Sequence, residues 1–348
     1  MYMGILNGLK TDIGVDLGTA NTLMYVKGEG IVVNEPTVIA LNTKTSQVLA
    51  IGNEAKRMMG RTPVHIEVIR PLVNGVISDF LMTQEILKNY IKKIKRDSLF
   101  RYVRAVVAVP TNLTEVERKS VEDAVISSGA SSVYLLEEPI AAVLGAGLPI
   151  GEPTANMIVD IGGGTTEIAV ISMGGVVVSR SLKVAGDKLN DEIMRFVRDE
   201  FKIAIGEPTA ERIKIEIGSA LPLAERLDLA VSGRDLSLGL PREVLIKDTQ
   251  VRGTLLPLLK HMVESIKDII EKTPPELSGD ILKRGIYLSG GGSLLRGLGE
   301  FIEKELSVKT ILVDDPLTCV VRGTGIAAEN IDAYMDVFAL ALKPIILE

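Results

Sequence analysis

Residues 157–171, with the sequence MIVDIGGGTTEIAVI, decide the fold of this chain. An apolar run ends at Asp160, three glycines and two threonines follow, and a second apolar run begins almost at once. This order predicts two strands joined by a glycine-rich turn. Glycines leave backbone N–H groups free to converge on an anion, because no Cβ blocks the approach. The stretch therefore predicts a hairpin that either binds phosphate or is simply a tight turn.

Asp160 stands directly beside this turn, and a carboxylate repels a bound phosphate unless a cation lies between them. Mg²⁺ is the expected cation, held through water because this ion gives up its hydration shell reluctantly. Two common phosphate motifs do not fit the stretch. The chain lacks the Gly-Lys-Ser/Thr of a P-loop, and the turn leads into a strand, whereas a dinucleotide-binding turn leads into a helix.

The same pattern occurs near the start of the chain. An apolar run ends at Asp16, the turn LGTANT follows as residues 17–22, and a second apolar run covers residues 23–26. Asp16 and Asp160 therefore hold matching positions in two similar hairpins. This weak internal repeat predicts two similar half-molecules that face each other. Turns on opposite sides of a cleft could then hold one polyphosphate from both domains.

The composition indicates a globular chain of more than one domain. Its 348 residues exceed a single core of ordinary size, and 46% of them are hydrophobic while 24% are charged. A mean hydropathy of +0.28 favours large cores, or an apolar surface that meets a partner or a membrane. The net charge of −6 argues against general nucleic-acid binding.

Several kinds of site are excluded by residue counts. Cys319 is the only cysteine, so the chain forms no intrachain disulfide and a reducing cytosol is expected. The only histidines are His65 and His261, which argues against a Ser-His-Asp triad and a His-rich zinc site. The first ten residues are too short for the apolar core of a signal peptide, and no run of about 18 apolar residues predicts a membrane span.

Elsewhere the chain alternates between strands and helices, which is typical of an α/β fold. The pattern of apolar residues predicts helices over residues 79–95, 188–201, 209–217 and 254–272. Residues 31–70 and 219–244 are rich in turns and short strands, and we expect them to form small inserted subdomains. A strand at residues 285–288 runs into the glycine-rich SGGGS of residues 289–293.

Six segments of the chain occur together in a characteristic order. They are IGVDLGTANT, GIVVNEPTVIA, EEPIAA, VDIGGGTTEIAVIS, TAERIKIEIG and YLSGGGSLLRGL. Over roughly residues 12–330 the chain resembles the MreB family of bacterial actins, within the actin, Hsp70 and sugar-kinase superfamily. The resemblance implies an α/β, actin-like two-lobed fold. In that fold two RNase H-like domains enclose a nucleotide cleft, and each carries a small inserted subdomain.

The resemblance also implies domain boundaries. The first lobe is expected at residues 1–147 together with 322–348, and its small subdomain at about 33–71. The second lobe is expected at residues 148–321, and its small subdomain at about 183–243.

Site residues are carried over from the family motifs position by position. The first phosphate loop falls on Gly18, Thr19, Ala20 and Asn21, and the second on Gly162, Gly163, Gly164 and Thr165. Asp16 and Asp160 are expected to hold Mg²⁺ through water. The adenosine of ATP is expected at Glu211, Arg212, Lys214, Gly290, Gly291, Gly292 and Ser293. Glu211 and Lys214 lie on one face of a helix, where a surface ion pair is the alternative.

Glu138 matches the glutamate that positions the attacking water in this family, and Thr165 is expected to hold the same water or the γ-phosphate. Water attack on phosphorus needs an acceptor in line with the leaving oxygen, while Mg²⁺ and backbone amides absorb charge. Glu137 is the alternative acceptor. Adjacent side chains on an extended chain point to opposite sides, so only one of the two glutamates can face the cleft.

A cationic stretch with two bulky apolar residues predicts contact with a membrane surface. Leu99 and Phe100 follow a helix end that is rich in lysine, and such cations suit an anionic leaflet. The family carries an apolar loop at this place, although both side chains could instead fold back onto the core. A second candidate anchor consists of the apolar residues Met1, Tyr2, Met3, Ile5 and Leu6.

The resemblance implies a membrane-associated bacterial actin that binds and hydrolyses ATP, assembles into filaments and organises cell-wall elongation and rod cell shape. The implied partners begin with further copies of the chain, in head-to-tail filaments and paired protofilaments. They also include the inner face of the cytoplasmic membrane and the cell-wall elongation proteins MreC, MreD and RodZ. The implied location is cytoplasmic and peripheral at that membrane.

Two other functions of the same superfamily stay open. A small-molecule kinase needs a base, usually Asp, that deprotonates an acceptor hydroxyl, and this chain has Glu at the corresponding place. An Hsp70-like chaperone needs a peptide-binding domain after the nucleotide cleft, and the sequence ends at Glu348. Sedimentation in ATP compared with ADP separates a filament from both alternatives.

Overall fold

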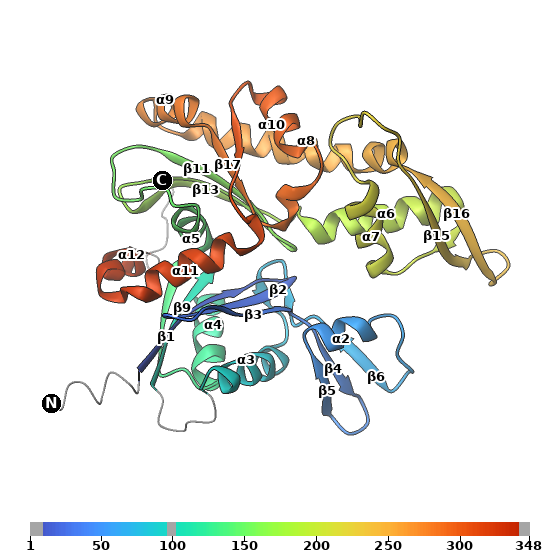
Figure 1. Cartoon of the computed structure of the whole chain (residues 1–348), viewed down its shortest axis with the longest axis horizontal. Helices are drawn as coiled ribbons and strands as arrows, with labels where there is room; N and C mark the ends of the chain where they lie inside the picture. Colours follow the sequence, from blue (N-terminus) through green and yellow to red (C-terminus); the bar gives the residue numbers. More distant parts are fainter. Residues whose placement is uncertain (1–9, 96–101, 341–348) are drawn as a thin grey trace.

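A computed structural model describes residues 10–95 and 102–340, which form two lobes, one above the other in Figure 1. Both candidate membrane anchors, Leu99 with Phe100 and the first six residues, lie outside the described residues. Each lobe is built on a five-stranded sheet, and each also carries a three-stranded sheet. The expected α/β, two-lobed architecture is therefore confirmed.

The sheet of the first lobe places the first hairpin near its centre. Its strands are β1 (Lys10–Leu17), β2 (Asn21–Val26), β3 (Gly30–Pro36), β9 (Tyr102–Val109) and β10 (Ser132–Glu137), in the order β10-β9-β1-β2-β3. β1 pairs antiparallel with β2 and parallel with β9. Most of β1 is buried, as expected for a strand with both faces covered.

The sheet of the second lobe repeats this arrangement. Its strands are β11 (Asn156–Ile161), β12 (Thr166–Ser172), β13 (Gly175–Leu182), β17 (Ile286–Ser289) and β18 (Thr310–Leu312), in the order β13-β12-β11-β17-β18. β11 pairs antiparallel with β12 and parallel with β17, and every residue of β11 is buried. The matching hairpins of the sequence thus occupy matching places in two similar sheets.

Helices cover both sheets. In the first lobe, α3 (Phe80–Lys95) and α4 (Glu115–Ser127) bury their apolar residues against the sheet. The second lobe is covered by α6 (Gly186–Phe201), α8 (Asp248–Lys272), α9 (Pro275–Arg284) and α10 (Leu298–Leu306). Within the described residues, no helix combines the length and the apolar character that crossing a membrane requires.

Two helices connect the lobes. α5 (Glu138–Gly145) and α11 (Cys319–Glu329) lie between the two sheets and pack against each other (Figure 1). A Cβ on Gly145 would lie 1.8 Å from the carbonyl oxygen of Cys319, and a Cβ on Gly323 would lie 1.8 Å from that of Ala141. The two helix backbones can approach this closely only because these positions are glycines. An apolar core that draws on both lobes surrounds the two helices.

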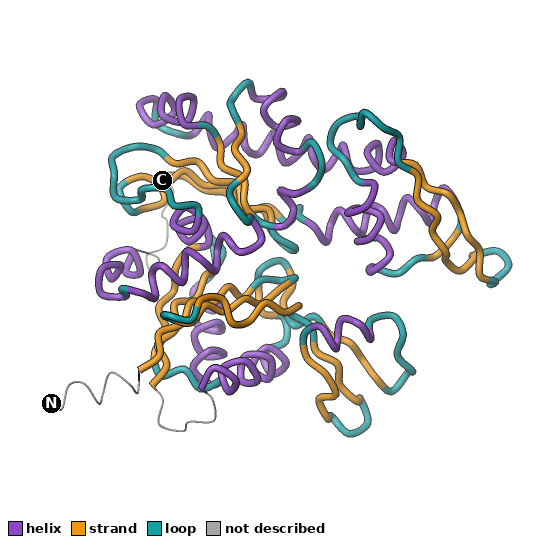
Figure 2. The backbone as a smooth tube through the Cα atoms, in the orientation of Figure 1, coloured by secondary structure: helices purple, strands orange, loops and turns teal. Residues whose placement is uncertain are grey.

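The small subdomains lie at the right of Figures 1 and 2, one on each lobe. The first contains β4 (Ile39–Asn42), β5 (Gln47–Ile51), β6 (Ile66–Ile69) and α2 (Asn53–Met58). The second contains β14 (Ile203–Ala204), β15 (Asp228–Asp235), β16 (Pro241–Lys247) and α7 (Glu207–Ile217). The remaining short elements are β7 (Leu72–Val73), β8 (Val76–Ile77), η1 (Gly291–Leu294), η2 (Pro316–Thr318), η3 (Ile331–Tyr334) and α12 (Met335–Leu340).

The start of α8 differs from the sequence prediction. The helix begins at Asp248 rather than at residue 254, because the Lys247 N–H donates to Gln250 Oε1 at 3.0 Å. Asp248 adds negative charge at the helix N-terminus, where it is favourable. Gly253 is a weak helix former, so the sequence pattern did not predict a helix over residues 248–253.

Candidate functional site

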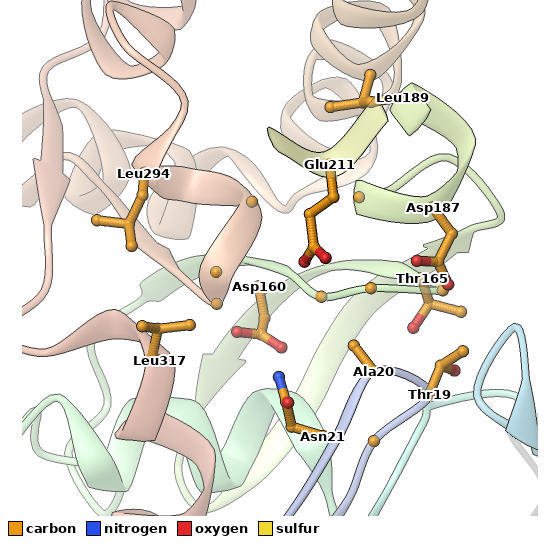
Figure 3. A pocket seen from close by; sticks show the side chains of 18 of the residues that line it. Thr19, Ala20, Asn21, Asp160, Thr165, Asp187, Leu189, Glu211, Leu294 and Leu317 are labelled. Atoms are coloured by element: carbon orange, nitrogen blue, oxygen red, sulfur yellow. The ribbon is translucent and has the colours of Figure 1, made fainter. Parts of the chain in front are cut away.

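A cavity of about 450 Å³ lies between the lobes. In Figure 3, Asp160 and Asn21 extend into the space between the lobes, Glu211 points toward it from α7, and Leu294 and Leu317 border one end. The glycine-rich turns of both lobes line the cavity with Gly18, Thr19, Ala20, Asn21, Gly162, Gly163, Gly164, Thr165, Gly290, Gly291 and Gly292. The structure therefore brings these expected loop residues together.

The two hairpin turns close in the same way. The Gly18 N–H donates to the Asn21 carbonyl oxygen at 3.0 Å, and the Gly162 N–H donates to the Thr165 carbonyl oxygen at 2.9 Å. Turns of this kind present backbone N–H groups to an anion. Because both turns face one cavity, a polyphosphate can be contacted from both lobes at once.

The tips of the two turns touch each other. A Cβ on Gly163 would lie 2.6 Å from the Cβ of Ala20, and a Cβ on Gly164 would lie 2.5 Å from Thr19 Oγ1. Both distances are too short for real side-chain atoms. The glycines of the second turn are therefore required by the approach of the first turn.

Three carboxylates lie deep in the cavity. Removal from bulk water, with a smaller effect of the Asp160 charge, raises the pKa of Asp16 to about 7. Burial raises the pKa of Asp160 to about 6, although its Oδ1 accepts a hydrogen bond from Ser289 Oγ at 2.6 Å. Desolvation and neighbouring carboxylates also raise the pKa of Glu138. Negative charge gathered in this way favours the binding of a cation.

The two aspartates fit a cation that keeps most of its own water. Among residues 10–95 and 102–340, no three His, Cys, Asp or Glu side chains gather closely enough to hold a metal ion directly. Mg²⁺ is commonly bound by one or two carboxylates together with substrate phosphates and waters. Asp16 and Asp160 therefore suit a metal that arrives with a polyphosphate.

Only one of the two adjacent glutamates faces the cavity. Glu138, the first residue of α5, lines it. Glu137 is buried on the other side, where its Oε1 lies 3.8 Å from Arg118 Nη2. The alternation expected for adjacent side chains therefore separates the two carboxylates.

Glu211 and Lys214 both line the cavity, but each has its own partner. Lys214 Nζ donates to the Gly186 carbonyl oxygen at 2.9 Å, and burial lowers the pKa of Lys214. Glu211 Oε2 lies 3.2 Å from Lys56 Nζ, which belongs to the opposite lobe. The alternative interpretation was a surface ion pair between Glu211 and Lys214. The two observed contacts are made with other residues.

Arg212 and Ser293 do not line the cavity. Arg212 Nη2 donates to the Ala230 carbonyl oxygen on β15 at 3.5 Å, because a residue next to Glu211 on a helix points in a different direction. Ser293 Oγ donates to the Gly290 carbonyl oxygen at 2.6 Å, within its own turn. The placement of these two side chains differs from the expectation of direct contact with adenosine.

Comparison with known proteins places the chain in a family. Residues 10–336 match the model of the MreB/Mbl protein family. The chain belongs to the MreB/Mbl family. The cell shape-determining protein Mbl of Bacillus subtilis strain 168 is 48% identical over 321 residues, which cover 92% of this chain and 96% of Mbl. The cell shape-determining protein MreB of Escherichia coli K12 is 46% identical over 328 residues, which cover 93% of this chain and 94% of that MreB.

Solved structures confirm the actin-like fold and the predicted family. MreB5 of Spiroplasma citri has been crystallised bound to ADP and bound to AMPPNP. Each structure matches with a TM-score of 0.90 at 39% identity, covering 94% of this chain and 98% of MreB5. The MamK double helical filament matches with a TM-score of 0.79 at 21% identity, covering 92% of this chain and 99% of MamK, which shows a likeness of fold.

Ion pairs between the lobes were missed by the reasoning from MreB-family motifs. Arg70 Nη1 lies 3.2 Å from Asp187 Oδ1, and Arg70 Nη2 lies 2.5 Å from Glu207 Oε1. With the pair between Lys56 and Glu211 they link cations of the first lobe to acidic groups of the second, and all of these residues except Glu207 line the cavity. We call these three ion pairs the interlobe clasp. The two residues of each ion pair are far apart in the sequence, so no local sequence pattern predicts the pairing.

Three apolar residues on the wall of the cavity were also missed. Ile215, Leu294 and Leu317 line the cavity and are 62%, 48% and 51% exposed. Large apolar side chains with so much open surface on a cavity wall are typical of a binding site for a flat or apolar group. Leu294 directly follows the SGGGS stretch, which is the only local signal that could have drawn attention to it.

The carboxylates of the cavity predict how the stability of the ligand-free protein depends on pH. The folded-state pKa values of Asp16 and Asp160, about 7 and about 6, lie above the ordinary value of 3.8. Their stabilising contribution is therefore complete below about pH 4 and is lost as the pH rises through 6 and 7. We expect the Tm in EDTA to fall by about 3 °C or more between pH 5.5 and pH 8.

The Asp16→Asn variant provides the control for this measurement by differential scanning calorimetry. Its side chain stays neutral at every pH, so its Tm is expected to fall less than that of the wild type. Equal falls in the two proteins would contradict the role given to Asp16.

Proposed function

We propose that this member of the MreB/Mbl family binds ATP with Mg²⁺ in the cavity, hydrolyses it, and assembles into filaments that organise cell-wall elongation and rod cell shape. One observation carries the proposal: two aspartate-tipped hairpins, one from each lobe, meet at a single cavity that also holds Glu138. The bound ADP and AMPPNP of Spiroplasma citri MreB5 support a nucleotide as the ligand. The names of the Bacillus and Escherichia relatives support a role in cell shape.

The cavity offers a place for each part of the nucleotide. The glycine-rich turns would hold the phosphates, and the water-bound Mg²⁺ would lie near Asp16 and Asp160, where it offsets phosphate charge. Glu211 and Lys214 would contact the ribose, and the apolar residues Ile215, Leu294 and Leu317 would cover the base. A polar, doubly clamped phosphate end and an apolar base end together fit a nucleoside triphosphate.

Glu138 is the proposed acceptor for the proton of the attacking water. Desolvation and nearby carboxylates raise its pKa, so its ionised form is a stronger base than an exposed carboxylate, and a nearby Mg²⁺ would favour that ionised form. Thr165, in the second turn, lines the same cavity and would hold the same water or the γ-phosphate. Glu137 is paired with Arg118 on the far side and has no such access.

Exposed apolar surface supports self-assembly. Leu236, Leu238 and Leu240 are 47%, 74% and 61% exposed around the tip of the β15–β16 hairpin. Clustered exposed leucines are typical of a surface that meets another protein. Head-to-tail filaments in paired protofilaments are the proposed assembly. We also propose the lobe boundaries given above. The protein would attach to the inner membrane face through Leu99 with Phe100 or through the N-terminus. MreC, MreD and RodZ are its proposed protein partners.

Sedimentation tests the proposed assembly. The full chain with Mg²⁺ is expected to pellet to a greater extent in ATP than in ADP, because a filament driven by ATP forms preferentially in the ATP state. A small-molecule kinase of the same fold would stay in the supernatant in both nucleotides, and that result would contradict the filament proposal.

The interlobe clasp predicts slow release of nucleotide. Arg70→Ala removes two ion pairs, each worth about 0.2–1 kcal/mol. We therefore expect stopped-flow release of a fluorescent ADP to be about 2- to 30-fold faster. Arg57→Ala, at an exposed arginine on α2, is the matched control and should release ADP at the wild-type rate.

Salt provides a second check on the clasp. Ion pairs at a partly exposed site weaken as ionic strength rises. Raising the salt concentration should therefore speed ADP release from the wild type more than from Arg70→Ala. The same salt response in both proteins would show that the clasp does not retain the nucleotide.

A further inference from the structure

Glu167 is a buried carboxylate beside the proposed reaction site. It is 1% exposed and does not line the cavity itself. In the pairing of β11 with β12, Glu167 lies directly opposite Asp160. Directly opposed residues of an antiparallel pair project from the same face of the sheet. Glu167 therefore lies on the face of the second sheet that carries Asp160.

Two hydroxyl groups hold this carboxylate from different lobes. Ser181 Oγ, on β13 of the same sheet, donates to Glu167 Oε1 at 2.5 Å. Thr111 Oγ1 donates to Glu167 Oε2 at 2.7 Å, and Thr111 follows β9 of the first lobe. Hydrogen bonds to a charged acceptor are stronger than those between neutral groups. Glu167 is thus a buried polar link between the two lobes.

Glu167 also acts on Glu138. Among the charges that raise the pKa of Glu138, after desolvation, that of Glu167 is the largest, ahead of those of Asp16 and Asp160. Burial raises the pKa of Glu167 as well, to about 7, while its two hydroxyl donors favour the charged form. Geometry connects the two residues as well, because Thr111 lies two residues beyond Val109, which pairs with Glu137 in the register of β9 and β10. Glu167 is therefore anchored next to the strand end from which Glu138 follows.

The first hairpin shows that a fold of this kind does not need a carboxylate here. Asp16 is paired with Leu23 in the register of β1 and β2, just as Asp160 is paired with Glu167 in that of β11 and β12. Leu23 is a buried apolar residue. Only the second lobe places an acid at this position, which burial makes unfavourable unless it is well paired. The acid is therefore better explained by its link to Thr111 of the first lobe than by the needs of the hairpin.

We propose that Glu167 is a positioning residue for ATP hydrolysis, which joins the lobes through Thr111 and keeps Glu138 directed at the attacking water. This inference rests on the proposed hydrolysis at Glu138. When the lobes separate, the bond to Thr111 is lost and Glu167 is held only by Ser181. Hydrolysis is then favoured in the closed arrangement of the lobes, in which both donors are engaged.

The test compares the hydrolysis rate with nucleotide affinity. Glu167→Gln keeps the size of the side chain and removes its charge. Single-turnover hydrolysis, at a protein concentration below that of filament formation, should be slower by about tenfold or more, the scale on which outer-shell partners act. The Kd for AMPPNP with Mg²⁺ should stay within about twofold of the wild-type value. The half-life of the folded protein at its melting midpoint should also stay within about twofold. A loss of affinity or stability in proportion to the loss of rate would assign Glu167 a purely structural role and overturn the proposal.

Thr111 provides a second and milder probe, which keeps the test decisive if Glu167→Gln does not fold. Thr111→Val has nearly the same shape but lacks the hydroxyl donor, so its hydrolysis should slow in the same direction. Thr111→Ser restores the hydroxyl and should recover most of the rate. Equal rates for the valine and serine variants would overturn the interlobe link.

Glu138→Ala distinguishes a failure of this inference from a failure of the proposed function. If Glu138→Ala is inactive while Glu167→Gln hydrolyses ATP at the wild-type rate, only the positioning role is wrong. If Glu138→Ala itself hydrolyses ATP at the wild-type rate, the proposed site of hydrolysis is wrong, and the role of Glu167 is wrong with it.

Discussion

Glu138→Ala is expected to bind ATP with nearly wild-type affinity and to hydrolyse it about 100-fold more slowly or worse. A positioned proton acceptor typically contributes a factor of this size or larger. Glu138 lines the cavity but belongs to α5 and not to the glycine-rich turns that would hold the phosphates, so its loss should spare binding. Single-turnover kinetics with the Kd for AMPPNP measured separately would distinguish the two effects.

Glu137→Gln is the matched control for this variant. It changes the adjacent acid, which is buried near Arg118 and faces away from the cavity. Its hydrolysis rate should stay close to that of the wild type. Wild-type turnover by Glu138→Ala, or a larger loss in Glu137→Gln, would overturn the assignment of the proton acceptor.

Gly163→Ala is expected to weaken ATP binding strongly, although it adds only one methyl group. The new Cβ would lie 2.6 Å from the Cβ of Ala20, so the two turns must move apart. Overpacking of this kind costs about 1–3 kcal/mol, which corresponds to a loss of roughly 5- to 150-fold in affinity. Isothermal titration of the full chain with Mg²⁺–ATP would measure this loss.

The geometry also offers a compensating variant. Ala20→Gly removes the methyl group that Gly163→Ala meets, so the double variant should recover most of the lost affinity. Gly253→Ala, in α8 and away from the cavity, is the control, because a Cβ there would have nothing within 4 Å. Failure of Ala20→Gly to restore binding would show that the two turns do not act on one ligand.

The hairpins could be predicted from the sequence because their signals are local. An apolar run, an aspartate and a glycine-rich turn occur within a few residues of one another, and they do so twice. The family motifs then placed the lining residues of both turns, together with Glu138 and Lys214. In each case the backbone of a single short segment determines where the side chain points.

The contacts between the lobes could not be predicted in this way. Arg70 and Glu207, or Thr111 and Glu167, are brought together only when both sheets are complete and packed through α5 and α11. Nothing near Arg70 in the sequence distinguishes it from an ordinary surface arginine. Arg212 shows how a motif can leave side-chain direction open, because its neighbour Glu211 reaches the cavity while Arg212 reaches β15.

The central claim is that paired aspartate-tipped hairpins hold a magnesium-bound triphosphate between the lobes. Isothermal titration of the full chain with ATP, in Mg²⁺ and then in EDTA, tests it most directly. We predict one ATP bound per chain in Mg²⁺ and binding at least about tenfold weaker in EDTA, since a metal-free triphosphate would face Asp16 and Asp160 without charge compensation. No uptake of ATP in Mg²⁺, or equal affinity in EDTA, would contradict the account.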